Sequence, residues 1–172
     1  MKKSRYLVEQ EVEVKGNKRV FTFLKSKDAV AILPITREGK VILVKQLRVP
    51  VGQEILEIPA GGIEEGEEPI FSAQRELREE TGYIGVNWTH ITTYYTSPGI
   101  TTETMHVFRA ELTEQGDLDL DEGEDITLEE MTLTDALQAI ESGKIVDGKT
   151  IIALFSEQII RNCINGHTNS TT

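Results

Sequence analysis

The chain has 172 residues, of which 38% are hydrophobic and 27% are charged, and its formal net charge is −11. This length suits one domain with a substantial core, and the acidic balance without a basic patch argues against binding to nucleic acid or to an anionic membrane. Cys163 is the only cysteine and no apolar stretch reaches membrane-spanning length, so the sequence excludes an intrachain disulfide and predicts a cytoplasmic protein.

Strand-like runs dominate the first third of the chain. In the short N-terminal segment, Phe21 and Phe23 alternate as the core residues of a strand would. Three apolar, β-branched runs follow, at 29–35, 40–47 and 54–58. The turn residues Arg37-Glu38-Gly39 separate the first two runs, which predicts adjacent strands.

A helix is predicted between Pro69 and Gly82, because proline suits the first turn of a helix and glycine suits its end. Within it, Ile70, Ala73 and Leu77 recur at helical spacing. One face of this helix is therefore expected to pack on a core.

The remaining chain alternates strands and helices. Strand-like runs occur at 89–96, 105–112 and 126–133. Thr132 with Asp135 resembles a capping box that opens a helix, and Gly143 ends it. A last helix is expected at about 150–162, followed by a disordered polar tail at 165–172. This mixture predicts an α+β sandwich.

Three glutamates in the first helix, Glu76, Glu79 and Glu80, share roughly one face near the C-terminal end. There like charges repel one another, and the helix dipole disfavours anions. A solvated acidic face is the ordinary interpretation of such a run. The alternative is a site for a hard divalent cation, Mg²⁺ or Mn²⁺, which prefers oxygen ligands and also binds phosphate oxygens.

The segment around these glutamates resembles the signature of the Nudix hydrolases. Its fixed positions, separated by five, seven, two and one intervening residues, are Gly61, Glu67, Arg75-Glu76, Glu79-Glu80 and Gly82. The resemblance implies a Nudix fold, a mixed β-sheet between α-helices, in a single domain with its core at about 28–162.

The same resemblance implies a metal site. Its ligands are expected to be the three glutamates with the backbone carbonyl of Ala60. Arg75 is expected to orient a glutamate of the motif, and an ordinary salt bridge from Arg75 to Glu79 is compatible with that role.

The flanks resemble the ADP-ribose pyrophosphatase branch of the family in four segments: VKQLR at 44–48, LEIPAG at 56–61, TSPG at 96–99 and DEGEDI at 121–126. By this resemblance Arg48 contacts the substrate's phosphates and Glu57 binds its terminal ribose, while Pro98 and Gly99 lie beside the substrate. Arg48 could instead be a surface charge at a strand end, and strand alternation would also allow Glu57 to face solvent.

The general base is expected in the acidic segment at 121–126, between the strand-like runs at 105–112 and 126–133. Glu122 matches the base of the branch, and Glu124 replaces it if the loop register differs. Glu79 within the helix is the other candidate, and a simple solvated turn is the ordinary interpretation of the acidic segment.

The resemblance implies Mg²⁺-dependent hydrolysis of ADP-ribose to AMP and ribose 5-phosphate. The small-molecule partner is then a nucleoside diphosphate sugar, the substrate, and the protein is expected to be a homodimer. Alternatives are another nucleotide sugar such as GDP-mannose, or a non-catalytic Nudix domain that senses nucleotide sugars.

Overall fold

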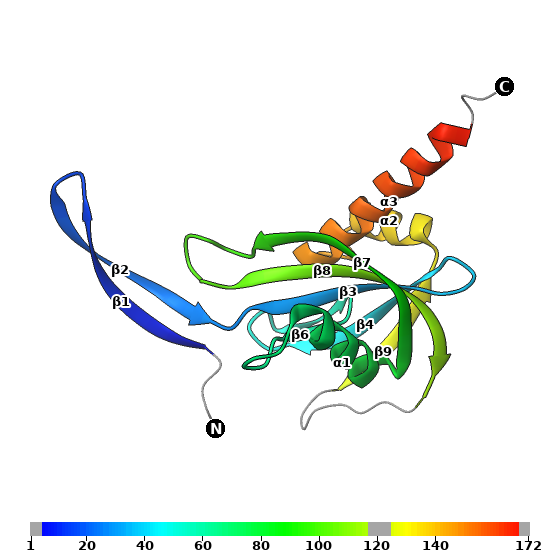
Figure 1. Ribbon diagram of the computed structural model, residues 1–172, viewed down its shortest axis with the longest axis horizontal. Coiled ribbons are helices and arrows are strands. Elements are labelled where there is room, and N and C mark those ends of the chain that lie inside the picture. Colours follow the sequence, from blue (N-terminus) through cyan, green and yellow to red (C-terminus); the bar gives the residue numbers. More distant parts are fainter. Residues whose placement is uncertain (1–4, 117–124, 169–172) are drawn as a thin grey trace.

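The computed structural model describes residues 5–116 and 125–168 (Figure 1). Its elements in chain order are β1 (Arg5–Val14), β2 (Asn17–Ser26), β3 (Ala29–Ile35), β4 (Val41–Arg48), β5 (Gln53–Glu57), β6 (Ala60–Gly62), α1 (Pro69–Thr81), β7 (Tyr83–Tyr95), β8 (Thr104–Gln115), β9 (Ile126–Met131), α2 (Leu133–Glu141) and α3 (Gly148–Thr168).

A seven-stranded mixed sheet forms the body. Its path is β5-β4-β3-β8-β7, with β6 also paired to β3 and β9 also paired to β4. The β3–β8 pair is parallel, whereas the other pairs of this sheet are antiparallel. Strands β3 and β4 pair only where Ile35 meets Val41, so beyond their turn each strand has other neighbours on both edges.

Two hydrophobic cores cover the two faces of the sheet, and β3 contributes to both because successive side chains of a strand point to opposite faces. Ala31 and Leu33 belong to the core beneath α2 and α3, whereas Val30 and Ile32 belong to the core beneath α1. Figure 1 shows α1 on one side of the sheet and α2 with α3 on the other. This sandwich confirms the predicted α+β class, with a mixed β-sheet between α-helices.

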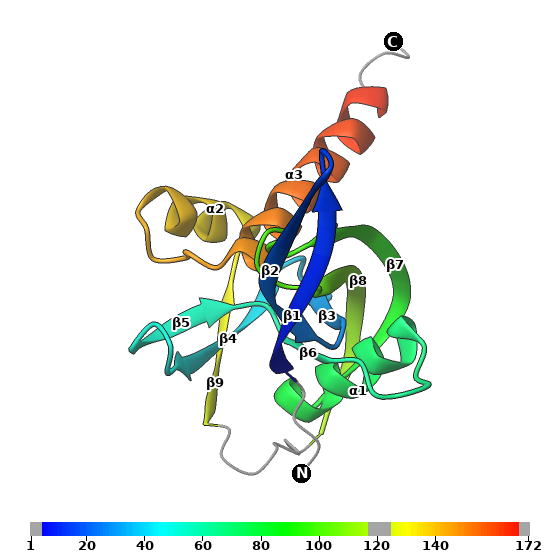
Figure 2. The same cartoon turned by 90° about the vertical axis from the view of Figure 1, so that its left-hand side faces the viewer.

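Strands β1 and β2 form a separate hairpin that extends away from the body in Figure 1 and lies in front of the body in Figure 2. Its turn residues Lys15 and Gly16 both have positive φ, 52° and 75°. At its base, Leu24 N–H donates to the Ile100 carbonyl at 2.7 Å. The expectation of a core position for Phe21 is wrong, because the hairpin leaves the body and Phe21 is 47% exposed.

Other differences concern element lengths. β7 begins directly after the first helix rather than at residue 89, and β8 is longer than predicted at both ends. α3 continues to Thr168, past the expected start of the disordered tail. The cap of α2 is confirmed, since the Thr132 side chain accepts from Asp135 N–H. Among residues 5–116 and 125–168, no helix is both long and apolar enough to cross a lipid bilayer.

Candidate active site

Helix α1 has the predicted ends and the predicted buried face. Pro69 occupies its first turn, and Gly82 at its C-terminal end has a left-handed φ of 71° and donates its N–H to the Arg78 carbonyl. Ala73 and Leu77 are fully buried in the core against β3 and β8. This packing fixes the rotation of the helix about its axis and therefore the direction in which its polar side chains point.

Arg75 is the centre of a hydrogen-bond network around this helix. Its Nη1 donates to Glu76 Oε1 at 2.7 Å and to Glu79 Oε2 at 2.9 Å. Its Nε and Nη2 donate to the two carboxylate oxygens of Glu67 at 3.2 and 3.1 Å, and Nη2 also donates to the Gly62 carbonyl at 3.0 Å. The predicted salt bridge to Glu79 is confirmed, and Arg75 also restrains Glu76.

Two of the helix glutamates converge on the backbone of β6. Ala60 N–H donates to Glu80 Oε2 at 3.1 Å, and Glu80 is 3% exposed. The carboxylate of Glu76 occupies the space that a side chain at Gly61 would need, because a Cβ there would lie 2.0–2.2 Å from the Glu76 carboxylate atoms. Pairing of β6 with β3 at Ala31 holds this backbone in place. The motif therefore brings the carboxylates of Glu76 and Glu80 to the backbone of two neighbouring residues, Ala60 and Gly61.

The donor chemistry of this cluster fits a hard divalent cation, since every side chain offered is a carboxylate. Glu76 and Glu79 are 12% and 31% exposed, so solvent reaches part of each side chain. Within the described part of the chain, however, no three His, Cys, Asp or Glu side chains stand as a ready ligand set. Arg75 already holds one oxygen of Glu76 and one oxygen of Glu79.

A second charged cluster joins β4, β5 and the start of α3. Arg48 forms a two-pronged pair with Glu57, Nε to Oε1 at 2.7 Å and Nη2 to Oε2 at 2.8 Å. Lys149 Nζ also donates to Glu57 Oε2 and lies 3.1 Å from Asp147. Glu57 is 2% exposed, so its interpretation as a solvent-facing strand residue is wrong.

The start of α3 is fastened to this cluster through Asp147. Its Oδ2 accepts from Thr150 N–H at 2.9 Å and from Thr150 Oγ1 at 2.6 Å, and Thr150 Oγ1 in turn accepts from Ile58 N–H at 2.8 Å. Sequence reasoning missed Asp147 and Lys149. The signal for Asp147 was present, because an aspartate three residues before a threonine at a helix start is a common N-cap pattern.

Electrostatics couple the two clusters. The hydrogen bond to Glu57 raises the pKa of Arg48, and the charges of Glu80 and Asp147 raise it further. Burial alone would raise the pKa of Glu57, but Arg48 and Lys149 outweigh burial and lower it. Both partners are therefore held in their charged forms.

Arg75 and Glu67 form a comparable pair. Burial lowers the pKa of Arg75, but hydrogen bonds to Glu67, Glu76 and Glu79 outweigh it and raise the pKa well above its usual range. The pKa of Glu67 is lowered, chiefly by its hydrogen bond from Arg75. The network keeps a fixed positive charge among the acids of the helix.

The other predicted site residues lie elsewhere or outside the description. Pro98 and Gly99 are in an exposed turn between β7 and β8, which contacts the base of the hairpin through Ile100. Glu122 and Glu124 lie outside the described residues.

Comparisons with known proteins agree with this geometry. The NUDIX domain family profile matches residues 25–153. The chain is 49% identical over 144 residues to ADP-ribose pyrophosphatase of Bacillus subtilis, covering 81% of this chain and 76% of the relative. It is 43% identical over 128 residues to the methanol dehydrogenase activator of Bacillus methanolicus, covering 73% and 69%. It is 31% identical over 156 residues to GDP-mannose pyrophosphatase of Escherichia coli K12, covering 86% and 81%.

Proposed function

The chain belongs to the NUDIX domain family, and on that premise we propose that it hydrolyses the diphosphate of ADP-ribose to AMP and ribose 5-phosphate. The observation that carries the proposal is the convergence of Glu76 and Glu80 on the backbone at Ala60 and Gly61. The 49% identity to ADP-ribose pyrophosphatase of Bacillus subtilis supports this choice of substrate. The complete set of acids favours an enzyme over a silent binding domain.

Hydrolysis of a diphosphate in this family calls for a divalent cation, and we assign Mg²⁺ or Mn²⁺ to Glu76, Glu79, Glu80 and the carbonyl of Ala60. When bound, the ion supplies positive charge for the diphosphate oxygens and makes water more acidic. Arg75 restrains two of these carboxylates at 2.7 and 2.9 Å, so its role is to position them.

Cationic side chains of the second cluster supply the remaining positive charge. Arg48 retains 37% exposure while bound to Glu57, which leaves part of its guanidinium open to the substrate's phosphates. The buried Glu57 fixes the direction of that guanidinium through two hydrogen bonds. In the proposal its carboxylate also accepts from a hydroxyl of the terminal ribose, and Pro98 and Gly99 lie beside the substrate.

The attacking water needs a base within reach. We propose Glu122 for this role, on the resemblance of its segment to the ADP-ribose pyrophosphatase branch, with Glu124 next in the same segment. Glu79 is the candidate among the described residues, and one of its carboxylate oxygens is already held by Arg75 Nη1 at 2.9 Å.

The proposal includes a cytoplasmic homodimer. Support comes from the hairpin, where Tyr6, Val12 and Phe21 lie on one face and are 48%, 39% and 47% exposed, because apolar side chains gathered on an extended arm are typical of an interface. Sedimentation of Phe21→Glu tests it, with Thr22→Glu as the control. Thr22 is exposed as well, and lies on the other face of the same strand. A wild-type monomer, or equal effects of both variants, would contradict the dimer.

The deciding experiment is hydrolysis across a panel of nucleoside diphosphate compounds with Mg²⁺, followed by phosphate release after phosphatase coupling. We expect the highest kcat/KM for ADP-ribose, with AMP and ribose 5-phosphate as products. A preference for GDP-mannose would move the assignment to the activity named for the Escherichia coli relative. Failure to hydrolyse any member of the panel would contradict the enzyme.

A further inference from the structure

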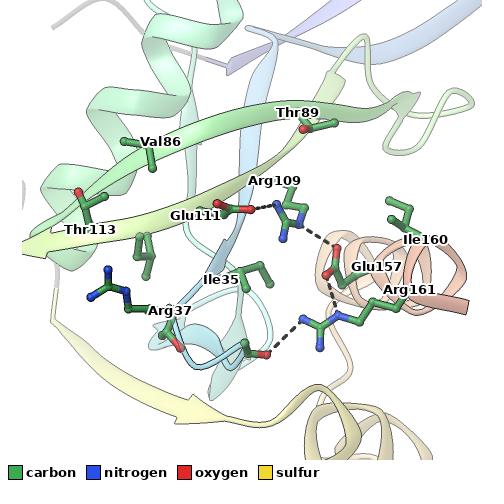
Figure 3. Close-up of a pocket in the computed structure, with 13 residues that line it drawn as sticks. Ile35, Arg37, Val86, Thr89, Arg109, Glu111, Thr113, Glu157, Ile160 and Arg161 are labelled. Atoms are coloured by element: carbon green, nitrogen blue, oxygen red, sulfur yellow. Dashed lines mark hydrogen bonds and ion pairs between the residues drawn. The ribbon is translucent and has the colours of Figure 1, made fainter. Parts of the chain in front are cut away.

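A cavity of about 860 Å³ lies at the end of β3 that is remote from β6. Its walls come from the turn after Ile35, from β7 and β8, and from the second half of α3 (Figure 3). The volume falls within the range of small-molecule sites, roughly 300–1,000 Å³. None of its lining residues belongs to the two clusters of the proposed active site.

A buried carboxylate between two guanidinium groups forms one side of this cavity. Glu157 is 2% exposed, and its two oxygens accept from Arg109 Nε at 3.1 Å and from Arg161 Nε at 2.8 Å. Arg109 Nη1 also donates to Glu111 at 3.1 Å, and Arg161 Nη2 donates to the Gly39 carbonyl at 3.2 Å. Figure 3 shows Glu157 between the guanidinium group of Arg109, which comes from β8, and that of Arg161, which comes from α3 like Glu157 itself.

These bonds do not use up the donors of the two arginines. A guanidinium carries five N–H donors, and in the described part of the chain Nη2 of Arg109 and Nη1 of Arg161 have no partner. The side chains of Arg109 and Arg161 are 21% and 33% exposed, so these donors can be reached from the cavity. Each of these nitrogens carries two N–H donors, which can bond to an oxygen of a carboxylate or phosphate group.

The buried carboxylate carries a cost for stability. Burying the charge of Glu157 costs desolvation energy that an apolar residue at this position would avoid. The cavity also carries local positive charge in a chain of net charge −11, because Arg37 joins Arg109 and Arg161 against only Glu111 and Glu157. Ile35, Val86 and Ile160 supply apolar wall next to these charges.

We propose that this cavity is a second ligand site, which binds a small organic oxyanion. The oxyanion, a phosphate or carboxylate, contacts the free donors of Arg109 and Arg161, and its apolar body lies against the aliphatic wall. Glu157 holds the two guanidinium groups in place, and its negative charge offsets part of their positive charge, so that binding depends on the shape of the anion as well as on its charge.

The test is a calorimetric titration of the full-length chain with phenyl phosphate and with benzoate, using benzyl alcohol as the uncharged comparator. We expect saturable one-to-one binding of an oxyanion at least about tenfold tighter than benzyl alcohol, the scale of one hydrogen bond to a charged group. The tighter of the two oxyanions identifies whether the natural group is a phosphate or a carboxylate.

Two variants locate the binding. Arg161→Met keeps the aliphatic stem and leaves Arg109 on Glu157, and Thr89→Trp fills the mouth of the cavity without removing a charge. We expect each to weaken binding about tenfold. Arg19→Met removes an exposed arginine on the hairpin and should change nothing.

Three results would overturn the proposal. The first is oxyanion binding no tighter than that of benzyl alcohol. The second is oxyanion binding that neither cavity variant changes. If that binding is lost in Glu80→Gln, the probe binds at the proposed active site instead. The third is a change in sedimentation on Arg161→Met, which would make this face an interface between copies of the chain.

Discussion

Gly61 and Glu76 stand so close that no side chain fits between them. A Cβ at position 61 would lie 2.0 Å from Cδ of Glu76, although one belongs to β6 and the other to α1. The glycine is needed here for close approach, whereas its neighbour Gly62 has nothing within 4 Å of a Cβ position.

Gly61→Ala should therefore displace the Glu76 carboxylate, while Gly62→Ala should not. We expect Gly61→Ala to lower kcat by roughly 10–100-fold, the usual cost of disturbing the support of a metal ligand, and to raise the Mg²⁺ concentration needed for half-maximal activity. Activity measured against Mg²⁺ for both variants checks this. Equal behaviour of the two alanine variants would contradict the role of Glu76.

Glu80→Gln tests the proposed metal site directly. The glutamine oxygen can still accept from Ala60 N–H, so we expect the fold to persist while kcat falls by about 10²-fold or more. Wild-type Tm should rise with added Mg²⁺, and the variant should lose most of that rise. Glu68→Gln, at the exposed start of the same helix, is the control. Near-normal turnover of Glu80→Gln at saturating Mg²⁺ would remove Glu80 from the site.

The identity of the base is tested by three matched variants. Glu122→Gln should lower kcat by roughly 10²–10⁴-fold with little change in KM, the usual range for loss of acid–base catalysis. Glu124→Gln should have a smaller effect. A larger loss in Glu79→Gln, accompanied by unchanged Mg²⁺ dependence, would assign the base to the helix instead.

Arg48 and Glu57 are expected to affect substrate choice differently. Arg48→Ala should weaken binding by about 1.5–3 kcal/mol for every nucleotide sugar alike, because the diphosphate is common to all. Glu57→Ala should reduce kcat/KM for ADP-ribose more than for GDP-mannose, since a site built to bind a hydroxyl discriminates strongly. Equal losses for the two substrates in Glu57→Ala would contradict the ribose contact.

The Glu57 cluster should make the fold sensitive to acid. Because Arg48 and Lys149 lower the pKa of Glu57 in the folded chain, its contribution to stability is fully present above the ordinary value of 4.5 and is lost as pH falls through the lower folded pKa. Unfolding free energy measured from pH 7 to pH 3 should fall more steeply in wild type than in Glu57→Gln. Glu13→Gln on the hairpin is the reference and should follow the wild-type curve of unfolding free energy against pH. Parallel curves for wild type and Glu57→Gln would contradict the prediction.

The sequence predicted best where local rules and the motif coincide. The ends of α1 and its buried face follow from Pro69, Gly82 and a helical apolar stripe, and the structure confirms them. The Arg75–Glu79 pair follows from spacing of four residues on one helix. In these cases each interaction lies within a few positions of the chain.

The sequence could not predict contacts that join distant segments. The Lys149 bond to Glu57 spans 92 residues, and no local pattern shows that α3 begins beside β5. Phe21 has the alternation of a core strand, but alternation does not reveal whether a strand joins the main sheet or leaves it. The role of Glu122 in the acidic segment at 121–126 rests on resemblance only, because Glu122 lies outside the described residues.

The parallel pairing of β3 with β8 has a consequence for how the chain folds. Thr104 N–H donates to Asp28 across 76 residues at the start of this pair, so the central strand cannot complete its pairing until the whole first two-thirds of the chain is present. Closing so long a loop costs entropy before any contact offsets it, and folding slows as contacts become less local. During synthesis, α1 can therefore pack on β3 before β8, the other strand beneath it, is present. Fragments that end before β8 should expose Val30 and Ile32 and aggregate rather than fold.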